Sequence, residues 1–256
     1  MTTTPTPSPQ TDHLLLSRNL AKTYPGMETA SLRCLDFSLR PGQALGLLGP
    51  NGAGKTTALS ILSTRLPSTS GTLHIGGVDA FRAPQKVRRM LGLVPQDIAL
   101  YPELTGRENL EFFGGFYGLS GEELASRIQH CLSFVLLEDV ADRQVANYSG
   151  GMKRRLNLAT ALLHDPSILL LDEPTVGIDT KSRNIILDSL SQLVRQGAAL
   201  IYTTHYLEEI ERICDTVIIL DAGEMLAHGT PEQLLSPGGE RNLQEFFEKL
   251  TDSRGE

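Results

Sequence analysis

The chain has 256 residues, of which 40% are hydrophobic and 21% charged, a balance typical of a folded globular protein with a substantial core. Its 23 basic and 30 acidic side chains give a net charge of −7, which argues against a nucleic-acid-binding surface. The sequence lacks the run of about 20 apolar residues that a membrane helix needs, so any role at a membrane is expected to pass through a partner.

The first third of the chain favours strands. Residues 1–11 are rich in Thr and Pro without an apolar segment, so we expect a disordered tail there rather than a signal peptide. Beyond it, Pro41-Gly42 and Gly76-Gly77 break up runs with strand character. These runs are Leu14–Leu16, Leu32–Leu39, Ala44–Leu48 and Gly71–Val78.

The middle of the chain changes character, because strand signals vanish between Pro102 and about His164. The helical runs in this block are Arg107–Tyr117, Glu122–Leu136 and Gly151–Leu163. The strands that follow are Ile168–Asp172, Ala199–Thr203 and Val217–Asp221, with amphipathic helices between them. The sequence therefore predicts an α/β core with a mainly parallel sheet and a helical block inserted into it. The last segment, 236–256, begins with a Gly/Pro break and continues into one short helix, Leu243–Leu250.

The strongest motif is a glycine-rich loop, Gly49–Thr56, that fits the pattern G-x-x-x-x-G-K-[ST]. An apolar strand leads into it and a helix starting near Lys55 leads out, which disfavours a chance glycine-rich turn. Glycine lets the backbone aim several N–H groups at one phosphate, and the helix N-terminus adds partial positive charge. Lys55 is expected to reach the β- and γ-phosphates, and the Thr56 hydroxyl can bind Mg²⁺.

A second motif is the apolar strand Ile168–Asp172, which ends in two carboxylates. Ligands of open parallel sheets sit beyond the carboxyl ends of strands, so Asp172 is expected near the glycine loop. There it can hold Mg²⁺, directly or through water, while Glu173 can serve as the base for an attacking water. On its own this motif is equally compatible with a structural role, but together with the loop it indicates an NTPase.

A third motif, Ser149-Gly150-Gly151, precedes a basic helix and forms a second potential anion site. One nucleotide does not need two such sites on one chain, so the simplest use for it is a γ-phosphate held by a neighbouring copy. The alternative is that Ser149 is an ordinary helix N-cap.

Taken in order along the chain, these motifs closely resemble the nucleotide-binding domain of ABC transporters, over about Leu14 to Leu235. The ordered set is Tyr24, Gly49–Thr57, Gln96, Ser149–Gly151, Asp172-Glu173, Asp179 and His205. The resemblance implies a P-loop NTPase core with an N-terminal antiparallel β subdomain and an inserted helical subdomain at about 97–164. We therefore expect the ATP-binding domain over residues 12–235, with 236–256 as a C-terminal extension.

The same resemblance implies the role of each site residue. Lys55, Gln96, Glu173 and His205 are the expected catalytic residues, and Thr56, Gln96 and Asp172 the expected Mg²⁺ site. The residues expected to contact ATP are Tyr24, Gly49, Pro50, Asn51, Gly52, Ala53, Gly54, Lys55, Thr56, Thr57, Ser149, Gly150, Gly151 and Asp179. Among them Tyr24 is similar to the aromatic residue that stacks on adenine, and Asp179 to the loop that communicates across the dimer.

The family also implies partners. Two identical or closely related subunits would pack head to tail around two ATP molecules, beneath an integral membrane permease at the cytoplasmic face of the cell membrane. Tyr148 and Met152 stand where the commoner signature has Leu and Gln, a variant that resembles the drug, polyketide-antibiotic and lipid export subfamily. The alternatives are a soluble ABC ATPase that works on ribosomes or DNA, and a binding module that has lost hydrolysis.

Two further features leave a choice open. The aromatic-rich run Glu111–Tyr117 either packs in the core of the helical subdomain or lines a groove for a permease helix. The three cysteines, Cys34, Cys131 and Cys214, have no metal-type spacing and are expected to be buried free thiols.

Overall fold

The computed structural model describes residues 13–235 and 242–252. The expected tail at 1–11 and part of the expected extension at 236–256 lie outside these ranges. Within the described ranges, no helix combines the length and the apolar character that crossing a membrane requires.

In the described part of the chain, ten strands form one sheet in the order β5-β4-β1-β2-β10-β9-β3-β8-β7-β6. Their bounds are β1 (Leu15–Lys22), β2 (Leu32–Leu39), β3 (Ala44–Leu48), β4 (Ser70–Ile75), β5 (Val78–Asp79), β6 (Leu91–Val94), β7 (Ile168–Asp172), β8 (Ala199–Thr203), β9 (Thr216–Asp221) and β10 (Glu224–Gly229). Strands β9, β3, β8, β7 and β6 pair in parallel, whereas β2, β1, β4 and β5 pair antiparallel. A single parallel bridge between Glu224 of β10 and Cys34 of β2 joins the two regions.

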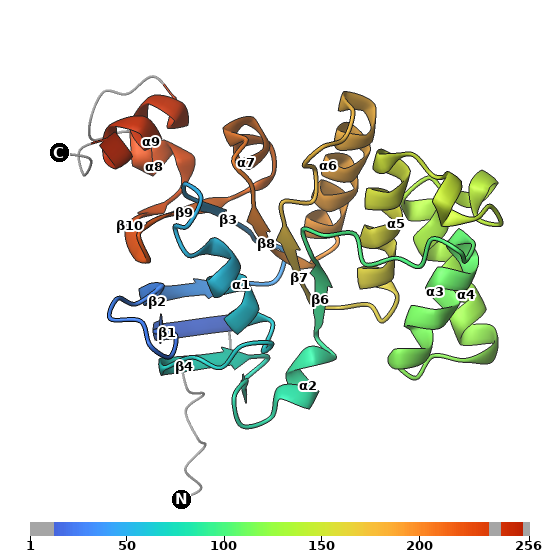
Figure 1. Cartoon of the computed structure of the whole chain (residues 1–256), viewed down its shortest axis with the longest axis horizontal. Coiled ribbons are helices and arrows are strands. Elements are labelled where there is room, and N and C mark those ends of the chain that lie inside the picture. The colour runs from blue at the N-terminus through green and yellow to red at the C-terminus, as the bar shows by residue number, and fades with distance from the viewer. Residues whose placement is uncertain (1–12, 236–241, 253–256) are drawn as a thin grey trace, which may run out of the picture.

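The helices surround the parallel region and form a separate lobe beside it (Figure 1). Their bounds are α1 (Lys55–Leu62), α2 (Pro84–Arg88), α3 (Gly106–Phe116), α4 (Gly121–Phe134), α5 (Gly150–Leu162), α6 (Thr180–Arg195), α7 (Leu207–Ile213), α8 (Pro231–Leu235) and α9 (Leu243–Asp252). Helices α3 to α5 make up the lobe at the right of Figure 1, in the span where strand signals vanish. The α/β fold class with a mainly parallel core sheet, an antiparallel β region and an inserted helical lobe is thereby confirmed.

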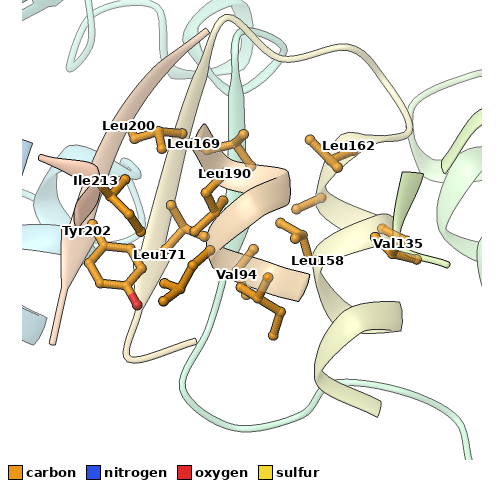
Figure 2. Close-up of a cluster of buried hydrophobic side chains, with 14 of the residues drawn as sticks. Val94, Val135, Leu158, Leu162, Leu169, Leu171, Leu190, Leu200, Tyr202 and Ile213 are labelled. Atoms are coloured by element: carbon orange, nitrogen blue, oxygen red, sulfur yellow. The ribbon is translucent and has the colours of Figure 1, made fainter. Parts of the chain in front are cut away.

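The parallel strands separate two hydrophobic clusters because side chains alternate across a sheet. In β7, Ile168 and Leu170 face the cluster that includes α1, whereas Leu169 and Leu171 face the cluster formed with α5, α6 and α7. Figure 2 shows this second cluster, in which Leu158 of α5 and Leu190 of α6 pack beside Leu171. All five residues of β7 are buried, so the strand that ends in Asp172 is held from both faces.

The structure corrects several sequence-based expectations. Strand β1 extends to Lys22, past the expected Leu16, because antiparallel pairing with β2 and β4 carries polar residues along it. Strand β10 and the short helix α8 were not expected. Cys131 and Cys214 are buried, but Cys34 is exposed, so the expectation of a buried thiol was wrong there. Cys34 is an outward-facing residue of β2, close to the Asp36 carboxylate.

The aromatic run Glu111–Tyr117 lies largely on the surface, so of the two alternatives left open, packing in the core of the helical lobe does not hold for most of its rings. Phe112, Phe116 and Tyr117 are exposed, with Phe116 at 74%, whereas Phe113 is half-buried. Phe112 contacts Tyr101 and Phe116 edge-on, at ring-centroid distances of 4.7 and 5.0 Å. These rings form an exposed aromatic cluster.

Candidate functional site

The glycine loop connects β3 to α1, and its backbone needs glycine at specific points. Gly52 and Gly54 have φ angles of +83° and +103°, which side chains of L-residues rarely adopt. A Cβ atom on Gly49 would lie 2.3 Å from the carbonyl oxygen of Leu220. Lys55 is buried, and its Nζ donates hydrogen bonds to the carbonyl oxygens of Gly49 and Pro50, at 2.6 and 3.1 Å. Two carbonyl groups at the start of the loop thus hold the Lys55 ammonium group.

This loop lines a cavity of about 710 Å³ together with residues from distant parts of the chain. The lining residues are Ser31, Gly49–Thr57, Gln96, Glu173 and His205. The fold therefore brings together the predicted loop, the glutamine after β6, the acid after β7 and the histidine after β8. Tyr24 lies at the edge of this group, with its hydroxyl 3.4 Å from Thr57 Oγ1.

Asp172, the last residue of β7, lies behind the loop. Its Oδ1 accepts a hydrogen bond from Thr203 Oγ1 at 2.8 Å. Burial raises the pKa of Asp172, and the neighbouring Glu173 carboxylate adds to this effect, against the lowering effects of Thr203, Lys55 and Thr56. Burial lowers the pKa of Lys55, while the Glu173 and Asp172 carboxylates oppose that shift.

Glu173 begins the turn that follows β7. Its φ of +47° is unusual for a residue with a side chain, and its N–H donates to the carbonyl and the hydroxyl of Thr203, both at 3.1 Å. The carboxylate accepts a hydrogen bond from Gln96 Nε2 at 3.3 Å and lies 3.6 Å from His205 Nδ1. Glu173 therefore contacts two other predicted catalytic side chains, Gln96 and His205, at the cavity that Lys55 also lines.

The oxygen donors beside the loop fit Mg²⁺, a hard cation that takes one or two protein oxygens and completes its coordination with phosphates and water. Thr56 and Asp172 provide such a pair, because Thr56 lies close enough to the Asp172 carboxyl to lower its pKa. Gln96, the third residue of the expected metal site, contacts Glu173 instead.

Ser149, Gly150 and Gly151 lie outside this cavity, at the N-terminus of α5. Ser149 Oγ accepts a hydrogen bond from the N–H of Met152 at 3.2 Å, so it caps the helix as the alternative interpretation foresaw. A Cβ atom on Gly151 would lie 2.0 Å from Ser182 Oγ, since α5 packs there against the start of α6. Asp179 caps α6 by accepting from the N–H of Ser182 at 2.9 Å, and hydrogen bonds from Ser182 lower the pKa of its carboxyl.

The structure adds residues that the sequence did not single out. Ser31, from the loop between β1 and β2, lines the cavity. Arg154 of α5 donates to the carbonyl oxygen of Gln96, and Thr203 bonds both Asp172 and the backbone of Glu173. Thr203 ends an expected strand, Ala199–Thr203, but no role was predicted for it. The others depend on contacts between segments far apart in the chain, for which the sequence carries no signal.

A strand–loop–helix unit of this geometry, with an acid at the end of another parallel strand of the same sheet, defines a P-loop nucleotide-binding protein. The family model described as "ABC transporter" matches residues 32–176. The chain is 46% identical over 232 residues to the linearmycin resistance ATP-binding protein LnrL of Bacillus subtilis, covering 90% of this chain and 74% of that protein. It is 42% identical over 222 residues to the Nod factor export ATP-binding protein I of Cupriavidus metallidurans, covering 87% and 73%.

Solved structures agree with the sequence relatives. An ATP-binding subunit of an ABC transporter superposes with a TM-score of 0.84 at 30% identity, covering 93% of this chain and 99% of that one. A dimeric ATP-binding cassette in a post-hydrolysis state, bound to ADP and Pi, gives a TM-score of 0.76 at 29% identity, covering 84% and 98%. The chain belongs to the ABC transporter family, and it is the ATP-binding, ATP-hydrolysing subunit, as the sequence predicted.

Proposed function

We propose that the chain powers an exporter by pairing with a second, identical or closely related subunit around two ATP molecules. Each ATP would lie between Gly49–Thr57 of one subunit and Ser149–Gly151 of the other. The observation that carries this proposal is the division of the predicted site. The catalytic residues line one cavity, whereas Ser149, Gly150 and Gly151 lie outside it at the start of α5. A second copy supplies the missing half.

In this proposal Glu173 is the general base. Its carboxylate takes a proton from water while the water oxygen forms a bond to the γ-phosphorus and the bond to the ADP oxygen breaks, releasing ADP and phosphate. Gln96 and His205 contact the Glu173 carboxylate and orient it. Lys55 and the loop N–H groups stabilise the charge of the transferring phosphoryl group. Mg²⁺, held by Thr56 and Asp172, supplies further charge neutralisation when bound.

The remaining assignments rest on relatives. Tyr24 would stack on adenine beside Thr57. Asp179, which lies near the Ser149–Gly151 segment of the same chain, would face the partner subunit. The chain spans about three quarters of the length of the two relatives above, whose names refer to antibiotic resistance and to export. We therefore propose export as the direction, an integral membrane permease as the partner, and the cytoplasmic face of the cell membrane as the location. The exposed aromatic cluster on α3 is a suitable surface for the permease.

The test uses the Glu173→Gln variant, which keeps the shape of the side chain but removes the base. We expect hydrolysis of Mg-ATP to fall by about 10²-fold or more, as for a general base whose contribution is typically 10²–10⁴-fold. Light scattering after size exclusion should show an ATP-dependent dimer, because this variant binds ATP without consuming it. Glu208→Gln, an exposed acid on α7, is the control and should hydrolyse ATP at the wild-type rate. Substantial hydrolysis by Glu173→Gln would remove Glu173 from the role of base.

A further inference from the structure

A buried carboxylate, Glu209, lies behind the hydrolytic residues and takes no part in the mechanism above. It belongs to the first turn of α7, and only 2% of it is exposed. Its Oε2 accepts hydrogen bonds from the hydroxyl groups of Thr204, Tyr202 and Thr175, at 2.7, 2.8 and 3.0 Å. Its Oε1 lies 3.5 Å from Arg183 Nε. One side chain thus contacts donors from the turn after β7, from β8 and the residue that follows it, and from α6.

Two of these donors are close in sequence to catalytic residues. Thr204 immediately precedes His205, and its Oγ1 also accepts a hydrogen bond from the N–H of Tyr206 at 3.0 Å. The backbone is therefore tied on both sides of His205. Thr175 follows Glu173 by two residues, after Pro174, in the turn that Glu173 begins. Because Thr204 and Thr175 donate to the same oxygen atom, Glu209 bridges the two backbone segments.

The other oxygen of the carboxylate reaches a third segment. Arg183 belongs to the first turn of α6, the helix that Asp179 caps, and its guanidinium lies 4.6 Å from the ring centroid of Tyr206. The ring of Tyr206 in turn lies 4.1 Å from that of His205. Through Arg183, the same carboxylate therefore connects the Asp179 segment to the histidine.

A carboxylate is costly to bury, and a packed apolar side chain often gives an equal or greater stability. The ionised form offers acceptor sites on both oxygens, which suits three hydroxyl donors on one side and a guanidinium on the other. An amide of the same shape has one acceptor oxygen, and its NH₂ group would face Arg183. The contacts of both oxygens therefore suit a carboxylate better than an amide.

We propose that Glu209 is a positioning residue for hydrolysis: it holds the backbone that carries His205 against the backbone that carries Glu173. The 3.6 Å approach of His205 Nδ1 to Glu173 Oε1 is the contact that it maintains. This inference rests on the proposed function, because it takes Glu173 and His205 as the hydrolytic pair.

The test measures kcat, KM for ATP and the folded fraction of Glu209→Gln at the assay temperature. A displacement of about 1 Å at a reacting group can cost about 10²-fold, so we expect kcat to fall about tenfold to a hundredfold. The KM for ATP should change less than about threefold, because Glu209 lies outside the lining of the phosphate cavity. The control is again Glu208→Gln, which alters the neighbouring exposed acid and should leave kcat unchanged.

Coupling to His205 separates positioning from a general loss of stability. In a His205→Ala background, Glu209→Gln should lower kcat by less than about twofold, since the residue that it positions is already gone. An equal loss in both backgrounds, or a wild-type kcat for Glu209→Gln, would overturn the inference. Such a result would reject only the positioning role of Glu209. The role of Glu173 as general base would stand as long as Glu173→Gln hydrolyses ATP far more slowly than wild type.

A second pair of variants decides the matter if Glu209→Gln does not fold. Thr204→Val removes the hydroxyl that links Glu209 to His205 and keeps the shape, whereas Thr204→Ser keeps the hydroxyl. We expect Thr204→Val to lose kcat about tenfold or more and Thr204→Ser to stay within about threefold of wild type. Equal kcat for the two variants, after correction for the folded fraction, would contradict the inference.

Discussion

At the scale of single residues, the site places unlike charges in surroundings that disfavour them. Asp172 and Lys55 are both buried, and burial is the largest influence on each pKa: it raises that of the acid and lowers that of the base. Their mutual attraction works against both shifts. A bound phosphate would pair with Lys55, and a bound Mg²⁺ would pair with Asp172. The two buried charges therefore lower the stability of the ligand-free protein, and ligand binding offsets this loss.

For Asp172→Asn we expect a more stable but inactive protein. Because the pKa of Asp172 is raised above its ordinary value of 3.8, the folded state binds more protons than the unfolded state between the two values. The free energy of unfolding therefore falls as pH rises through that window, and the deficit persists at neutral pH. The amide removes it, so Tm should rise at pH 7, while kcat falls by about 10²-fold or more.

The measurement for Asp172→Asn is a Tm series from pH 8 to pH 5, without nucleotide. The difference from wild type should be largest at the alkaline end and shrink as the pH falls toward the raised pKa of Asp172. Thr203 Oγ1 can donate to an amide oxygen as it does to the carboxylate, so the packing is retained. A lower Tm for the variant at pH 7 would contradict the assignment of burial as the main influence.

At the scale of elements, capping hydrogen bonds fix the N-termini of several helices, and the N-termini of α5 and α6 also hold predicted site residues. Thr105 caps α3 through a reciprocal pair: its hydroxyl accepts from the N–H of Glu108, and the Glu108 carboxylate accepts from the N–H of Thr105. Hydrogen bonds from the Thr105 backbone and side chain lower the pKa of Glu108. Ser120 stands at the same position of α4 in the described structure but makes no capping hydrogen bond.

This difference predicts unequal effects of the same substitution. Thr105→Ala should lower the free energy of unfolding by about 1 kcal/mol, the usual effect of losing an N-cap. Ser120→Ala is the matched control and should change it by less than about 0.5 kcal/mol. Urea unfolding followed by circular dichroism measures both values. Similar losses for the two variants would show that the hydroxyl of Thr105 does not stabilise α3.

At the scale of the whole molecule, the site is completed by a second copy in our proposal, and a glycine offers a way to test this. A Cβ atom on Gly150 would have the carbonyl oxygen of Gly177 as its nearest neighbour, at 4.0 Å, so alanine fits within one subunit. The same atom would stand on the exposed start of α5, where the partner's phosphate is expected.

Gly150→Ala, placed in the Glu173→Gln background, should therefore fold with an unchanged Tm and lose most of its ATP-dependent dimer. Gly115→Ala on α3 is the matched control, since a Cβ atom there meets no described atom within 4 Å, and it should dimerise normally. Light scattering with and without Mg-ATP compares the two proteins. Normal dimerisation by Gly150→Ala would place the partner's nucleotide away from this segment.

Much of this molecule follows from local sequence. The glycine loop, the apolar strands β3, β7 and β8, and the helices of the inserted lobe are set by short-range patterns: glycine where φ is positive, short continuous apolar runs in the buried strands, and helical periodicity. Expected bounds of α3, α4 and α5 differ from the structure by no more than two residues at either end. Because the family's motifs are short contiguous segments, they were recognisable along with the family itself.

Other features were decided only by the tertiary structure. The exposure of Cys34 and Phe116 depends on which face of an element meets the core, and sequence does not state which side a neighbour covers. The contact of Gln96 with Glu173 and the gathering of hydroxyls at Glu209 join residues from separate strands. Sequence determined which groups are present and the local shape of the loop. Packing of the parallel strands determined which groups meet, because their carboxyl ends converge at one edge of the sheet.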